Sequence, residues 1–147
     1  MSTMATDEAI TIGGIEVRFL LEGEQTGGAL AIFEFGVAAG TKVPAPHSHD
    51  GYDETIYGLE GVLTWTVEGE THDVAPGEVL TIPRGVVHGF DNVGDVDARA
   101  LAVVTPGILG PAYFREVADV LARAAGGPPD LAAVAEVMRR HGLTPAT

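Results

Sequence analysis

Three histidines have the residue type and the spacing of a metal site. His47 and His49 lie two residues apart, and side chains alternate across an extended strand, so both should project from one face and bind one ion. A carboxylate follows at Asp53 or Glu54, after the turn dipeptide Asp50-Gly51, which can bring the chain back to the same side. This segment therefore predicts a local group of metal donors.

His88 supplies a further donor from a distant strand. It follows Pro83-Arg84-Gly85, in which proline fixes φ for a turn and glycine allows the chain to reverse. Neutral imidazole and ionised carboxylate suit first-row divalent ions, and the chain has no cysteine for a zinc-thiolate or copper(I) site. We predict one divalent transition metal per chain, without distinguishing Fe, Mn, Ni, Zn, Co and Cu. Four protein ligands would leave a position for water or substrate, as in a catalytic centre.

The other two histidines have simpler interpretations. His72 stands beside Asp73 in an expected polar turn between strands. His141 precedes Gly142 at the end of an expected helix, where a positive charge complements the helix dipole. Neither has an evident partner in the sequence, so neither is expected to bind the metal.

Short strands of alternating polarity are expected to position these residues. After a polar start over residues 1–8, the clearest runs cover 15–22, 29–37, 62–68 and 98–105. Glycine-containing turns separate the runs. Short antiparallel strands at such regular spacing predict an all-β sandwich or jelly-roll barrel, which can hold a ligand in its mouth.

The period of the apolar residues changes from two to three and four near the C-terminal end. Gly110-Pro111 is expected to start one helix, and Asp130 is expected to cap a second helix that ends at Gly142. Each helix carries an apolar stripe, so we expect both to pack on the outer face of the barrel or on a partner subunit. In the alternative arrangement, Tyr113 and Phe114 form a lid.

Two segments resemble the signature motifs of the cupin superfamily. The first covers residues 40–61 and reads GTKVPAPHSHDGYDETIYGLEG, with one residue more than the usual form before His47. The second covers residues 77–92 and reads GEVLTIPRGVVHGFDN, with every fixed position present. The resemblance implies metal ligands at His47, His49, Glu54 and His88, and so favours Glu54 over its neighbour Asp53.

The resemblance also implies a fold and an activity. The expected fold is a double-stranded β-helix, the jelly-roll cupin barrel, over residues 1–109, with a C-terminal extension of two helices over 110–147. The chain is similar to small bacterial cupins grouped with quercetin 2,3-dioxygenase. This likeness implies a metal-dependent dioxygenase acting on a flavonol-like or other enol or aromatic small molecule, with Glu54 as the catalytic base. Two alternatives stay open: a non-oxidative isomerase, lyase or cyclase, and a cupin that only binds a small molecule.

Composition narrows the range of partners. The 147 residues include 46% hydrophobic residues, which excludes a disordered chain, and the formal net charge of −13 disfavours nucleic acid and anionic membranes. No early apolar run follows a basic stretch, so we expect a cytoplasmic protein. The strand around Glu54 has apolar residues on both faces, including Tyr57 and Leu59 on the outer one, and this pattern predicts a homodimer.

Overall fold

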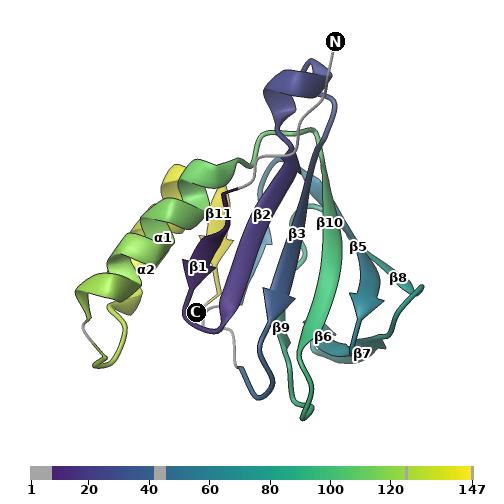
Figure 1. Ribbon diagram of the computed structural model, residues 1–147. Coiled ribbons are helices and arrows are strands. Elements are labelled where there is room, and N and C mark those ends of the chain that lie inside the picture. Colours follow the sequence, from purple (N-terminus) through teal and green to yellow (C-terminus); the bar gives the residue numbers. More distant parts are fainter. Residues whose placement is uncertain (1–7, 42–45, 125, 147) are drawn as a thin grey trace.

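Two antiparallel sheets face each other in the computed structural model, which describes residues 8–41, 46–124 and 126–146 (Figure 1). Residues 1–7 of the expected polar start and residues 42–45 of the first motif lie outside the described residues. The arrangement is the all-β jelly roll with two C-terminal helices that the sequence predicts. Whether residues 1–109 and 110–147 form separate units stays a prediction.

The larger sheet has six strands in the order β1-β2-β3-β10-β5-β8. Their bounds are Ile10–Ile12 for β1, Ile15–Leu21 for β2, Ala31–Val37 for β3, Ala98–Thr105 for β10, Asp53–Glu60 for β5 and Val79–Ile82 for β8. A short 3-10 helix, η1 (Gly23–Thr26), connects β2 to β3. The predicted runs at 15–22, 29–37 and 98–105 correspond to β2, β3 and β10.

The smaller sheet has five strands in the order β11-β4-β9-β6-β7. Their bounds are Leu143–Pro145 for β11, His47–His49 for β4, His88–Asp91 for β9, Leu63–Val67 for β6 and Glu70–Val74 for β7. The predicted run at 62–68 corresponds to β6. Because β4 and β9 are neighbours, the two sequence motifs meet in this sheet.

Alternation of large and small residues shapes the space between the sheets. On the inner face of the larger sheet, Phe33 and Phe35 of β3 lie beside Ala102 and Ala100 of β10, respectively. Phe35 reaches across to Trp65 of the smaller sheet, with ring centroids 6.1 Å apart. The aromatic rings thus fill the centre of the sandwich, with the small alanines packed beside them.

The two C-terminal helices form a hairpin, α1 (Pro111–Arg123) and α2 (Leu131–Arg140). As predicted, proline opens α1, and the Asp130 carboxylate accepts a hydrogen bond from the Ala133 backbone N–H (3.0 Å) at the start of α2. Helix α1 contacts β1, and α2 contacts β11, which are edge strands of different sheets. The hairpin therefore covers the side of the sandwich where both sheets end (Figure 1).

Strand β11 was not expected from the sequence. Gly142, with a φ of +81°, reverses the chain after α2, and the next three residues pair with β4. The Thr144 hydroxyl also donates a hydrogen bond to Asp50 (2.7 Å). A three-residue strand is too short to show a period, so only its partner strand identifies it. Strand β11 therefore supports β4, the strand that contains His47 and His49.

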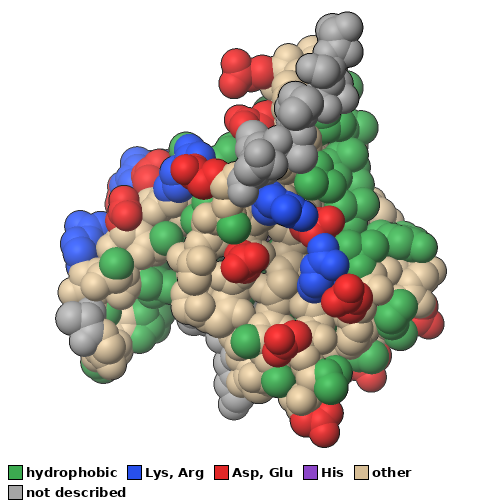
Figure 2. All heavy atoms as spheres, in the orientation of Figure 1, with side chains coloured by type: hydrophobic (Ala, Val, Ile, Leu, Met, Phe, Trp, Pro, Cys, Tyr) green, Lys and Arg blue, Asp and Glu red, His purple; other side chains and the backbone are tan. Residues whose placement is uncertain are grey.

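The outer face of the larger sheet has a charged cluster beside an apolar patch (Figure 2). In the cluster, Arg99 forms ion pairs with Glu34 and Glu60. Leu101, Tyr57 and Val79 lie side by side on β10, β5 and β8, and we call them the outer apolar patch. Tyr57 and Val79 are 41% and 60% exposed. In the described part of the chain, neither helix has the length and apolar character needed to span a bilayer.

Candidate metal centre

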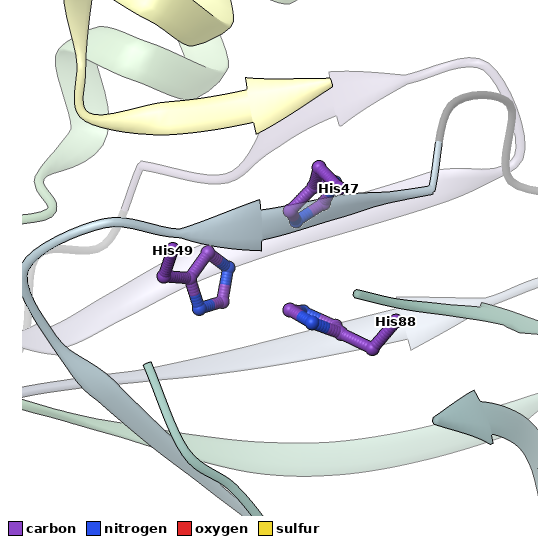
Figure 3. Close-up of side chains that lie close together, drawn as sticks. All are labelled: His47, His49 and His88. Carbon is purple, nitrogen blue, oxygen red and sulfur yellow. The ribbon is translucent and has the colours of Figure 1, made fainter. Parts of the chain in front are cut away.

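Three histidine side chains meet on the inner face of the smaller sheet (Figure 3). His47 and His49 both come from β4, and His88 lies directly opposite His47 on the antiparallel neighbour β9. One ring nitrogen from each residue can be chosen so that all three lie within 4.8 Å of one another. We call these residues the histidine triad, and they are positioned to hold one metal ion.

The turn before β9 brings His88 to the triad. The Val86 backbone N–H donates to the Pro83 carbonyl (3.3 Å), and Gly85 has a φ of +82°, a conformation that favours glycine. The Gly85 N–H in turn donates to the His49 carbonyl (2.8 Å). The proline and glycine of the second motif therefore fix the turn directly against the strand that carries the other two histidines.

Glu54 faces the triad from the opposite sheet. Its Oε1 atom lies 3.8 Å from His49 Nε2 and 3.6 Å from His88 Nε2, and the residue is 7% exposed. Asp53 occupies the other face of β5 and accepts hydrogen bonds from the Arg84 backbone N–H (2.8 Å) and guanidinium. These hydrogen bonds lower the pKa of Asp53. Of the two candidate carboxylates, Glu54 is the one near the triad, and Asp53 anchors the turn before His88.

Burial and hydrogen bonding set the protonation of the centre. Burial lowers the pKa of His49 to about 4, although the Glu54 charge opposes this shift, so His49 is neutral near pH 7. Burial alone would raise the pKa of Glu54, but the close approach of His88 and the positive charge that the histidines can carry lower it. The His88 Nδ1–H donates to the Val86 carbonyl (3.0 Å), so Nε2 is the ring nitrogen that faces Glu54. Imidazole nitrogens beside an ionised carboxylate match the donor chemistry of a divalent transition metal.

The separation of the donors is somewhat larger than the value for one shared ion. Two nitrogens on one metal are about 3.0 Å apart at an angle of 90° and about 3.4 Å apart at the tetrahedral angle, because metal–nitrogen distances are about 2.1 Å. The triad nitrogens fall within 4.8 Å. Side-chain movements on the order of 1 Å would therefore bring all three onto one ion.

Comparison with known proteins agrees with this geometry. A family model described as a cupin domain matches residues 33–104, which contain the triad and Glu54. An uncharacterized protein of Streptomyces coelicolor, SCO3923, is 33% identical over 93 residues, covering 63% of this chain and 81% of that protein. The chain belongs to the cupin superfamily.

Two further relatives of this cupin have named activities. Quercetin 2,3-dioxygenase of Bacillus subtilis is 32% identical over 73 residues, or 50% of this chain but only 21% of the enzyme. The structure of the polyketide cyclase RemF of Streptomyces resistomycificus is similar with a TM-score of 0.55 and 28% identity. That match covers 75% of this cupin and 83% of the cyclase. The likeness to the dioxygenase is thus confined to one segment, whereas the likeness to the cyclase extends over most of both chains.

Aromatic rings support the histidines of this cupin from behind. Tyr52 stacks on His49, with centroids 4.4 Å apart and an angle of 18° between the rings, and Trp65 stacks more distantly on His88 at 6.4 Å. Among the described residues, His49 Nδ1, the Tyr52 hydroxyl and Trp65 Nε1 are buried without a hydrogen-bond partner. Packing, rather than a network of polar side chains, therefore restrains these rings. No pattern in the sequence indicates this role, because the contacts form only in the folded sandwich.

A cavity of about 130 Å³ opens beside the triad. The inner faces of both sheets line one side of it, with Phe35, Trp65 and Phe90. The helical hairpin lines the other side with Tyr113, Phe114, Val117, Leu121, Val134 and Met138. The helices thus form a wall of the cavity beside the triad, whereas the sequence predicted a position on the outer face of the barrel or on a partner subunit. A lid formed by Tyr113 and Phe114 stays a prediction.

The remaining histidines lie outside the triad. His72 is on strand β7, paired with Trp65, so the prediction of a turn at this position was wrong. His141 directly follows α2, as predicted, but it also has a partner that the sequence did not reveal. Its Nε2 atom lies 2.8 Å from Glu116 Oε2 on α1, and this contact ties the two helices together.

Proposed function

We propose that this cupin is a metal-dependent enzyme acting on a small aromatic or enolic molecule. A dioxygenase is the first candidate. The main support for the proposal is the composition of the cavity wall. Besides the triad and Glu54, the side chains lining the cavity in the described part of the chain are apolar, except for the polar atoms of Trp65 and Tyr113. No lysine or arginine lines it there. Even with one charged group bound to the metal, a sugar phosphate or a dicarboxylate would leave its hydroxyls or second carboxylate without partners in such a cavity, at a high cost in free energy.

The volume of the cavity limits the size of the substrate. A cavity of about 150 Å³ lined by apolar side chains can hold one benzene molecule. The cavity of about 130 Å³ beside the triad therefore encloses one ring of similar size. A molecule with several rings would extend toward the opening of the cavity or displace the helical hairpin.

The residues around the cavity have distinct proposed roles. The histidine triad would hold the divalent ion, with Glu54 as a fourth ligand or a near neighbour. When bound, the ion would act as a Lewis acid and lower the pKa of a substrate hydroxyl. Glu54 is ionised near neutral pH and faces the same space, so it would accept the proton of that hydroxyl. The aromatic walls would exclude water and so strengthen the interaction between the charges.

The likeness to quercetin 2,3-dioxygenase favours oxygenation of the deprotonated substrate. The more extensive likeness to RemF favours a second candidate, a cyclase that uses the same proton transfer without dioxygen. Both candidates require an acidic enol or phenol held against a cation and a carboxylate. They differ in whether dioxygen is consumed.

An oxygen electrode and a substrate absorbance trace, recorded together, test the proposal. The metal-loaded protein would be mixed with quercetin and with the single-ring enol maltol, in air and under nitrogen. Dioxygenase activity predicts oxygen uptake in step with substrate loss and no reaction under nitrogen. Equal turnover under nitrogen would instead support the non-oxidative candidate. Chelator-treated protein is the control, and turnover that survives complete metal removal would contradict both candidates.

A further inference from the structure

Tyr113 is the only residue of the hairpin that lines the described cavity with a polar group. It belongs to the first turn of α1, and its side chain is 6% exposed. Glu54 acts on it electrostatically, so the phenol and the carboxylate share the same space. The other hairpin residues in the wall, among those described, are hydrocarbon or thioether side chains.

The hydroxyl of Tyr113 is available to a ligand. Among the described residues it makes no hydrogen bond, yet it is not one of the buried polar atoms sealed off without a partner. The Tyr52 hydroxyl and Trp65 Nε1 are sealed off in this way. Tyr113 therefore offers an accessible hydrogen-bond donor on the wall that the hairpin forms.

Contacts within the hairpin hold the Tyr113 ring in place. The ring lies edge-on to His141, with centroids 5.6 Å apart, and edge-on to Phe114 at 5.0 Å. His141 is fixed in turn by Glu116, one turn of helix beyond Tyr113. A donor held at a fixed place on the wall can distinguish between ligands by the position of their oxygen atoms.

We propose that Tyr113 is a specificity-determining residue whose hydroxyl donates a hydrogen bond to a second oxygen of the substrate. The preferred ligand is then an aromatic or enolic molecule with two separated oxygens, an ionisable hydroxyl at the metal centre and a carbonyl or similar acceptor at Tyr113. This assignment rests on the proposed function and narrows its substrate class. Burial, together with the Glu54 charge, raises the pKa of Tyr113, so the phenol stays protonated and able to donate near neutral pH.

Calorimetric titration of the cobalt(II)-loaded protein with two pairs of phenols tests the assignment. The pairs are 3-hydroxyacetophenone with 3-ethylphenol and 4-hydroxyacetophenone with 4-ethylphenol, in which a carbonyl oxygen replaces hydrogen atoms at nearly constant size. The wild type should prefer the ketone in at least one pair. Tyr113→Phe should reduce that preference by about 3- to 10-fold, the value of one neutral hydrogen bond. Its cobalt content and melting temperature should match those of the wild type, because the change removes one oxygen atom.

Tyr52→Phe is the matched control. It also removes a phenolic hydroxyl near the site, but Tyr52 does not line the cavity, so the ketone preference should persist. An unchanged preference in Tyr113→Phe for both pairs would overturn the assignment while leaving the proposed function intact. An equal loss in Tyr52→Phe would also overturn it, because the effect would then come from packing. Failure of all four phenols to bind would overturn the proposed function and this assignment together.

Discussion

His88 Nε2 and Glu54 Oε1 lie 3.6 Å apart inside the barrel. The His88 ring donates at Nδ1 to the Val86 carbonyl, so Nε2 is the nitrogen directed at the carboxylate. Glu54 is an ionised acceptor with a lowered pKa. An imidazole nitrogen without a proton and a carboxylate are both acceptors, and two acceptors in a buried space are unfavourable unless a cation lies between them.

Either a second proton on His88 or a metal ion can fill that role. His49 Nε2 also lies 3.8 Å from the same Glu54 oxygen, and His47 completes the triad. Several donors that converge on one point suit a metal ion better than a proton, which is shared between two atoms only. The arrangement therefore leads to predictions about metal binding.

Replacement of His88 by alanine should remove most of the bound metal. The change deletes one donor of the triad, and loss of an outer-shell partner alone costs about 10- to 100-fold in metal affinity. We expect the affinity to fall by more than about 100-fold. Elemental analysis after dialysis, together with a competition titration against a chelator, measures the effect.

His72→Ala is the control for this experiment. His72 lies on β7 outside the triad, so about one metal per chain should remain. Similar metal retention in the His88→Ala and His72→Ala proteins would contradict the assignment of the triad.

Glu54→Gln should separate metal binding from proton transfer. Glutamine keeps the shape and one carbonyl oxygen of glutamate, but it cannot accept the substrate proton. The variant should retain much of its metal and lose turnover by about 100-fold or more, the usual contribution of a general base. Glu60→Gln is the control on the same strand, since the exposed Glu60 pairs with Arg99 on the outer face, and it should keep full turnover. Full activity in Glu54→Gln would remove Glu54 from the mechanism.

The sequence predicted the strands that have a regular pattern. β2, β3 and β10 each have seven or eight residues with apolar side chains on one face, so period two is visible. β1 and β11 have three residues each, and pairing with β2 and β4 defines them. The sequence did not predict these two edge strands. It therefore could not predict the position of the helical hairpin, whose helices pack on them.

The site was predicted in part for similar reasons. His47, His49 and His88 combine a distinctive residue type with a spacing that strands convert into proximity. The choice between Glu54 and Asp53 depended on how the turn after His49 realigns the chain, which spacing alone does not determine. Tyr113 lines the cavity because α1 packs against the sheets, and the local sequence does not determine such a tertiary contact.

The metal-free protein should lose stability as the pH falls. The pKa of His49 is about 6.5 in the unfolded chain and about 4 in the folded one, so the unfolded chain binds more protons between these values. The stabilising contribution is complete above about pH 6.5 and decreases as the pH falls toward 4. The lowered pKa of Glu54 adds to the loss at still lower pH. The contribution of His49 to the free energy of unfolding is about 3 kcal/mol in order of magnitude.

Urea unfolding in the presence of a chelator, between pH 7.5 and pH 4.5, measures this dependence. His49→Gln should flatten the profile above about pH 5, because it removes the titrating group. His72→Gln should leave the profile unchanged. A free energy of unfolding that stays constant in the wild type from pH 7 to pH 5 would contradict the prediction.

The outer apolar patch should mediate a homodimer. Tyr57 and Val79 are 41% and 60% exposed on a flat sheet face next to Leu101, and burial against a second copy would remove this surface from water. We expect light scattering at micromolar concentration to give about twice the 15.2 kDa chain mass. The double variant Tyr57→Asp, Val79→Asp should be monomeric, because it would bury four carboxylates in the symmetric interface. Val93→Asp, at a residue 72% exposed outside the patch, should remain dimeric. A wild-type mass near that of one chain would rule out the dimer, and a dimer that persists in the double variant would place the interface on another face.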